Sequence, residues 1–151
     1  MRALFLLGRL IFGGFFVFNG INHFRNQEGM SQYAAAKGVP AADTAIPVSG
    51  ALLLAGGLSV MAGLKPRQGL AALLGFLVPV TLTMHRFWEV EEPQQRMNEM
   101  INFSKNLALI GATMMMLQLE HPWQASVDQA RSADEEMFVR LGSRELRSLP
   151  A

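Results

Sequence analysis

Hydrophobic residues in this chain form long blocks that are separated by short polar clusters. Apart from Arg9, no charge interrupts residues 3–22, and none occurs in 44–64 or 68–84. A helix that crosses a bilayer needs about 20 predominantly apolar residues. The blocks therefore predict four transmembrane helices, at about 3–22, 44–64, 68–88 and 102–119.

A water-soluble four-helix bundle is the alternative, and it would need charged or polar residues at regular intervals on a solvent face. The second and third blocks contain no charge at all. Arg9 and Lys105 fit a membrane helix if they lie near its ends, where long side chains reach the headgroups. The first block resembles a signal peptide, but the bulky, polar segment 19–23 offers no cleavage site. We expect an all-α, integral membrane four-helix bundle.

The last part of the chain is more polar than the rest. Pro122 marks the exit from the fourth helix, so we assign residues 1–120 to the membrane domain and 121–151 to a short soluble tail. Residues 125–141 predict an amphipathic helix at the protein surface or the membrane interface. A partly disordered tail is the alternative. The apolar stripe of this helix consists of Val127, Ala130, Met137 and Leu141.

The distribution of Lys and Arg predicts the orientation. With four spans, the N-terminus, the loop between the second and third helices and the tail share one side of the membrane. Lys and Arg near the membrane are somewhat more frequent on that side, which is typical of the cytoplasmic face. We expect both termini in the cytoplasm. The residues compared are Arg2, Arg9, Lys65, Arg67, Arg131, Arg140, Arg144 and Arg147, against Arg25, Lys37, Arg86, Arg96 and Lys105.

Small residues recur at every fourth position of the second predicted helix, and the first helix has Gly13 and Gly14 at its centre. Small residues let membrane helices approach closely, so we expect these two helices to pack together. Within the third helix, Pro79 predicts a kink that re-aims the segment around His85. The ladder of small residues comprises Ala51, Ala55, Ser59 and Gly63.

The composition of the chain excludes several classes of function and of catalytic chemistry. Only 17% of the residues are charged and the net charge is +1, which provides no basic surface for nucleic acid. The absence of cysteine excludes disulfides, thiol redox centres and cysteine metal sites. The sequence has no nucleotide-binding glycine fingerprint, no P-loop and no serine elbow. Redox chemistry would therefore come from a bound cofactor or a partner protein.

Polar residues gather at the ends of three predicted helices that meet on the same, outer side of the membrane. His23 ends the first helix, and His85, Trp88 and Glu89 share a face at the end of the third. Lys105 lies inside the fourth helix, where a buried charge is costly without partners. We expect a shared pocket. Its candidate ligand-binding residues are His23, His85, Trp88, Asn102, Lys105 and Asn106, supported by Asn19, Asn22 and Glu89.

Such a pocket suits a small polar head group, either a quinone carbonyl or a lipid phosphate. Histidine, lysine, asparagine and the Trp88 N–H are donors, and phenylalanines and methionines provide an apolar trough. A metal ion is disfavoured, because only two imidazoles are available and no spacing typical of a metal site occurs. No catalytic residue is assigned, and whether the protein is an enzyme stays open.

Several segments resemble the DoxX family of small bacterial membrane proteins. The similarity covers about residues 1–118, and its most specific parts are HRFW and the K-N-x-x-L pattern of KNLAL. It implies a four-helix bundle in the bacterial inner membrane, with site positions matching at His23, His85, Trp88, Lys105 and Asn106. The segments are GRLIFGGFFVFNGINHF (8–24), YAAAKGVP (33–40), SGALLLAGGLSVMAGL (49–64), HRFW (85–88) and NFSKNLALIGATMM (102–115).

The resemblance also implies a redox-linked role. DoxD-like relatives are implicated as the membrane subunit of thiosulfate:quinone oxidoreductase, and some actinobacterial relatives as parts of a membrane oxidoreductase complex. We expect a redox-associated membrane subunit, with a quinone as its cofactor and partners in or at the membrane. A non-catalytic scaffold or stress-response partner is the alternative. A small-solute transporter is less favoured, because no inverted repeat is present. Assembly into an oligomer stays open.

Overall fold

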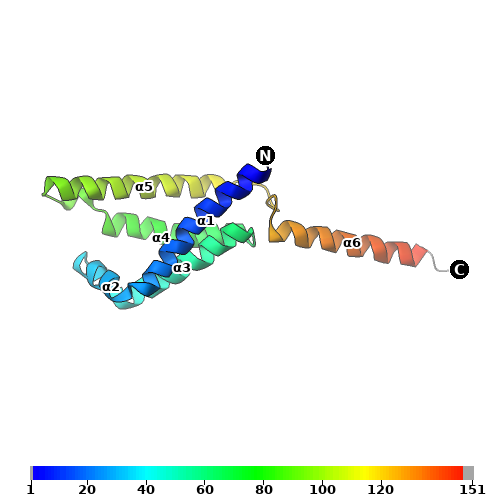
Figure 1. Cartoon of the computed structure of the whole chain (residues 1–151), viewed down its shortest axis with the longest axis horizontal. Coiled ribbons are helices and arrows are strands. Elements are labelled where there is room, and N and C mark those ends of the chain that lie inside the picture. Colours follow the sequence, from blue (N-terminus) through cyan, green and yellow to red (C-terminus); the bar gives the residue numbers. More distant parts are fainter. Residues whose placement is uncertain (1, 148–151) are drawn as a thin grey trace.

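The chain folds into helices only, and the computed structural model describes residues 2–147, with the side chains of residues 2–140. No strand occurs in that range, which confirms the predicted all-α class. Most of the helices are grouped in a bundle, and the last one extends away from it (Figure 1). The elements are α1 (Arg2–Arg25), α2 (Gln27–Ala36), α3 (Ala42–Ala62), α4 (Pro66–Met84), η1 (Phe87–Glu89), α5 (Pro93–Leu117) and α6 (Val127–Arg147).

Four segments within the described residues are long and apolar enough to cross a membrane, which confirms the predicted number of spans. Two boundaries differ from the prediction. α4 ends at Met84 instead of continuing to residue 88, and α5 begins at Pro93, nine residues before the predicted start at 102. The four segments are Arg2–Arg25, Ala42–Ala62, Pro66–Glu89 and Pro93–Leu117.

Local sequence explains where α5 begins. Pro93 occupies the first turn, where its missing N–H costs nothing, and the Glu92 side chain accepts hydrogen bonds from the backbone N–H groups of Gln94 and Gln95. A helix of 25 residues is about 37 Å long, more than the ~30 Å thickness of the hydrocarbon core. Its first turns therefore extend past the apolar block.

The α1–α3 contact depends on glycine. A Cβ at Gly57 would lie 2.7 Å from the carbonyl oxygen of Gly13, and one at Gly20 would lie 3.0 Å from that of Gly50. Glycine is therefore needed where the two backbones approach this closely. Gly14, which was expected to take part, has no atom within 4 Å of such a Cβ.

The structure corrects the predicted ladder of small residues on α3. Ala51 and Ala55 are exposed, because the face of α3 that meets α1 carries Gly50 and Gly57 instead. Ser59 faces α4: its hydroxyl donates to the carbonyl of Leu64, and a Cβ at Gly69 would overlap it.

Gly63, the last member of the predicted ladder, ends α3 at a positive φ of 65°. The short turn from Gly63 to Lys65 then makes α3 and α4 antiparallel neighbours, as expected. Within α4, Thr81 and Thr83 donate to the carbonyls of Leu77 and Pro79.

The bundle is an open row. α1 packs on α3, α3 on α4 and α4 on α5, whereas α1 and α5 make few contacts with each other. The buried core, which includes Phe16, Leu53 and Leu73, follows this row. One end of the bundle, called here the histidine end, contains the C-terminal ends of α1 and α4 and the start of α5. The opposite end, called the arginine end, contains the start of α1 and the α5–α6 loop.

The tail combines an anchored loop with a projecting helix. Trp123 is only 2% exposed and packs edge-on against Phe5 of α1, while the backbone N–H of Lys65 donates to Asp128. α6 then extends away from the bundle (Figure 1). The predicted polar helix is thus present over Val127–Arg147 and is longer than expected. The Leu141 side chain and residues 148–151 lie outside the described part.

Candidate functional site

A cavity of about 430 Å³ lies at the histidine end, between α1, α2, α3 and α4. Its volume falls within the ~300–1,000 Å³ range of small-molecule sites, and its walls are mostly apolar. Two histidines and Tyr33 are the ionisable side chains in the wall. The lining residues include His23, His85, Tyr33, Met30, Ile46, Leu52, Phe76, Pro79, Val80 and Met84.

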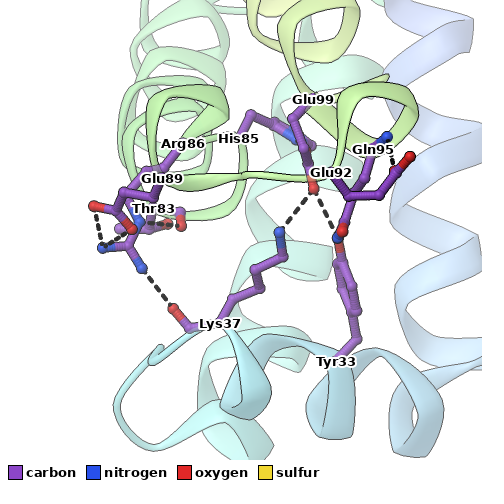
Figure 2. A network of polar contacts seen from close by, with 9 residues as sticks. All are labelled: Tyr33, Lys37, Thr83, His85, Arg86, Glu89, Glu92, Gln95 and Glu99. Carbon is purple, nitrogen blue, oxygen red and sulfur yellow. Dashed lines mark hydrogen bonds and ion pairs between the residues drawn. The ribbon is translucent and has the colours of Figure 1, made fainter. Parts of the chain in front are cut away.

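His85 lies where α4 ends. Its backbone leaves the helical region, with φ −116° and ψ 44°, which turns the chain away from the α4 axis. Its Nδ1 donates to Oε2 of Glu99 at 2.8 Å, because a carboxylate only accepts (Figure 2). This bond fixes the orientation of the ring and leaves Nε2, in a residue that lines the cavity, without a hydrogen-bond partner among the described residues.

Glu99 of α5 is the centre of a polar cluster. It is 5% exposed, and Lys37 donates to its Oε1 at 2.7 Å, with the Tyr33 hydroxyl at 3.3 Å. Figure 2 shows Tyr33 and Lys37, from α2 and its C-terminal end, and His85, from the end of α4, pointing at the carboxylate. A buried carboxylate needs such partners to offset its lost hydration. The hydrogen bond to Glu99 raises the pKa of Lys37.

A second cluster, next to the first, fixes the chain that follows α4. Arg86 donates to the backbone carbonyl of Lys37 at 3.0 Å and to that of Thr83 at 3.2 Å, and it pairs with Glu89 at 3.1 Å. The predicted proximity of Glu89 to His85 on one helical face is corrected, because the helix has already ended. Arg86 instead ties the α2–α3 loop to the end of α4.

His23, in the last turn of α1, is buried. Its Nδ1 lies 2.8 Å from the carbonyl oxygen of Asn19, one turn earlier, and its ring packs edge-on against Phe76. A carbonyl only accepts, so Nδ1 carries a proton, and in the neutral ring Nε2 carries a lone pair. Within the part of the chain that the structure describes, neither His23 nor His85 has a hydrogen-bond partner at Nε2.

The structure does not bring the other four predicted ligand-binding residues into this cavity. Trp88 is 51% exposed and packs on Phe87 and Phe103. Lys105 is exposed and donates to Asn102 of the same helix, whereas Asn106 is buried. The physical reason is that α5 packs on α4 and contributes no residue to the wall of this cavity, whereas its own buried face carries residues 99, 106 and 113.

The supporting asparagines serve local structure at the end of α1. Asn19 donates its amide to the carbonyl of Phe15, and its own carbonyl orients His23. Asn22 and Asn26, one turn apart, hydrogen-bond to each other. These bonds satisfy polar groups where the helix ends, and only Asn19 contributes to the geometry of the cavity.

Sequence analysis missed Tyr33, Lys37 and Glu99. Tyr33 and Lys37 lie on or just after α2, a short helix that the hydrophobic blocks did not predict. Glu99 fell between the predicted third and fourth spans. The seven-residue spacing of Glu99, Asn106 and Thr113, which all turn to one face, was the available sign that Glu99 faces inward.

The donor set favours an organic ligand. Two imidazoles in an apolar wall offer hydrogen bonds to a small head group, and the aliphatic and aromatic side chains offer contact area. Among residues 2–140, no three His, Asp or Glu side chains lie together in a way that could hold a metal ion.

Comparison with known proteins gives one match. The model of the DoxX family matches residues 4–86, which covers α1, α2, α3 and α4 and includes both cavity histidines. No curated protein and no solved structure matches the chain.

Proposed function

The chain belongs to the DoxX family, and from that premise we propose that it is a redox-associated membrane protein whose cavity at the histidine end binds a quinol head group. The observation that carries the proposal is the pair of histidines, His23 and His85, in the wall of one apolar cavity, each with Nδ1 already engaged.

Hydrogen-bond polarity selects the ligand. A neutral imidazole whose Nδ1 carries the proton can only accept at Nε2. In their neutral form, both histidines thus present acceptors, and a quinol offers two hydroxyl donors on a flat apolar ring. An oxidised quinone and an ionised lipid phosphate offer acceptors only. The geometry therefore supports the reduced quinol over both.

The Glu99 carboxylate is the acceptor for a proton that a bound quinol releases through His85. A hydroxyl that donates to His85 Nε2 is linked through the ring to Nδ1–H and the Glu99 carboxylate, which lies 2.8 Å away. Lys37 and Tyr33 keep that carboxylate ionised and oriented. The chain has no thiol, so we assign the matching electron acceptor to a partner protein with its own redox centre.

We further propose that the protein lies in the bacterial inner membrane with both termini in the cytoplasm. A quinol dissolved in the bilayer would reach the cavity from between the helices. Lys65, in the α3–α4 turn, and Arg67, in the first turn of α4, then face the cytoplasm together with Arg2, which agrees with the enrichment of basic residues on that side. The histidine end faces outward.

Binding of a short-chain quinol to the purified protein in nanodiscs tests the site. Loss of one hydrogen bond costs about 1 kcal/mol, so His85→Ala and His23→Phe should each weaken binding about fivefold, and the double variant about 25-fold. His121→Ala is the matched control, because that ring stacks on Trp123 at the opposite end. The oxidised quinone should bind more weakly than the quinol.

The result that refutes the site is unchanged quinol affinity in the double variant. If the wild-type protein binds neither the quinol nor the quinone, the quinol function itself fails. In that case, the non-catalytic scaffold becomes the better explanation of the fold.

A further inference from the structure

Arg9 is a buried cation at the arginine end of the bundle. It is 4% exposed, and its guanidinium donates to the backbone carbonyls of Gln124 at 3.3 Å and Ala125 at 2.7 Å. Its Nε has no hydrogen-bond partner. Among residues 2–140, no Asp or Glu forms an ion pair with it. The positive charge is therefore unbalanced where water is scarce, which is costly.

Trp123 adds a second unsatisfied donor. Its indole Nε1 is buried without an acceptor, although buried tryptophans usually find one. Its ring lies between Phe5 and His121. Buried donors of this kind call for an explanation, such as an ion or ligand that occupies the site in the membrane.

Both residues line one cavity of about 380 Å³. The rest of its wall is apolar and comes from α1 and α5, the two helices that make few contacts with each other. Gly8 and Ala112 are small residues that leave space in the groove between the two helices. No atom lies within 4 Å of a Cβ placed at Gly8. The seam between α1 and α5 thus combines an apolar groove with a cationic end.

We propose that this cavity binds one anionic phospholipid, with its phosphate at Arg9 and Trp123 and an acyl chain along the α1–α5 seam. An anionic head group balances the guanidinium charge, which a zwitterionic one does not. The apolar groove favours a lipid over a soluble phosphate, because its apolar walls match a hydrocarbon chain. The site lies at the opposite end from the histidine cavity, so its failure would leave the quinol proposal untouched.

Native mass spectrometry of the full chain, purified in mild detergent from membranes that contain phosphatidylglycerol and phosphatidylethanolamine, tests the proposal. The wild-type protein should retain one phosphatidylglycerol. Gly8→Leu fills the groove without touching Arg9, and its occupancy should fall at least tenfold. Gly111→Leu is the matched control: it also has free space around its Cβ but does not line the cavity, and it should retain the lipid.

Arg9→Gln should lose the lipid as well. If Arg9→Gln folds poorly, the lipid occupancy of Gly8→Leu still tests the proposal. The proposal is overturned if the wild-type protein retains no anionic lipid, or if Gly8→Leu retains as much as the wild type.

A second measurement distinguishes a lipid from a soluble anion as the ligand of this cavity. In a Trp88→Phe background, the emission of Trp123 reports on this cavity alone, since the chain has two tryptophans. Phosphatidylglycerol added to delipidated protein should shift the emission, and glycerol phosphate at the same concentration should not. An equal response to glycerol phosphate would overturn the assignment to a lipid.

Discussion

At the histidine end of the bundle, Lys37 and His85 meet the Glu99 carboxylate, whereas at the arginine end Arg9 meets two backbone carbonyls and the Phe5 ring. The first cluster balances its charge within the protein. The second has no acidic partner among the described side chains and lies beside an open apolar groove. This difference is the basis of the two proposals, a neutral ligand at the histidine end and an anion at the arginine end.

The two ends also differ in how they hold the chain. At the histidine end, side chains on or just after α2 and α4 share one carboxylate of α5, so the cluster joins elements far apart in sequence. At the arginine end, a packed tryptophan and the Arg9 hydrogen bonds hold a loop against α1. Substitutions can therefore loosen one end and leave the other intact.

Trp123→Ala should have the largest effect, confined to the arginine end. Truncating a buried tryptophan costs about 3–5 kcal/mol. The loop should detach from α1, and trypsin should cut at Arg131 at least tenfold faster, as followed by gel electrophoresis. Trp88→Ala is the control, since that ring is half exposed. Equal cleavage of the two variants would contradict the idea that Trp123 anchors the tail.

Glu99→Gln should have the next largest effect, confined to the histidine end. It removes the charge that balances Lys37 and weakens the acceptor of the His85 hydrogen bond, at a cost of about 2–3 kcal/mol, below the ~3–5 kcal/mol of a fully buried pair because Lys37 is 20% exposed. Thermal unfolding followed by tryptophan fluorescence measures the loss. Glu91→Gln, an exposed residue, should cost nothing, and a similar loss in both variants would rule out the cluster as a stabilising element.

The smallest expected effect is a pH dependence of the stability that the Lys37–Glu99 pair contributes at the histidine end. The pKa of Lys37 is raised above its ordinary value of 10.5, chiefly by the hydrogen bond to Glu99. The stability that this pair contributes is therefore fully present below about pH 10.5 and is lost as the pH rises through the higher folded-state value. The contribution should stay under about 1 kcal/mol, because Lys37 is partly exposed.

Unfolding temperatures measured between pH 8 and 11.5 for the wild type and Lys37→Met check this dependence. The wild type should be more stable at pH 8, and the two should converge at the alkaline end. A constant difference across the range would show that Lys37 contributes through packing rather than through charge.

Much of the fold was predictable because the membrane imposes a simple rule. Uncharged blocks about 20 residues long can satisfy their backbone hydrogen bonds in lipid only as helices, so four spans followed directly. His23 and His85 were predictable in the same way, since polar residues at helix ends on one side of the membrane must lie near each other. Hydropathy alone could not predict α2, a short helix outside the apolar blocks.

The rotation of each helix about its own axis was the main source of error in predicting which side chains face inward. Asn102, Lys105 and Asn106 are close in sequence, yet Lys105 is exposed while Asn106 is buried. Each residue advances the helix by about 100°, so a small error in register changes which side chain faces inward. The same uncertainty explains why Ala51 and Ala55 were expected at a contact that Gly50 and Gly57 make.

The sequence by itself determined the number and order of the long apolar helices and the two histidines of the cavity, because these depend on hydrophobic blocks that a bilayer sorts directly. Only the tertiary structure decided that Glu99 and Lys37 form the cluster beside His85, and that Arg9 lies against the Trp123 loop. Those contacts join residues 14, 62 and more than 100 positions apart. They depend on the rotation and packing of whole helices, which no local pattern specifies.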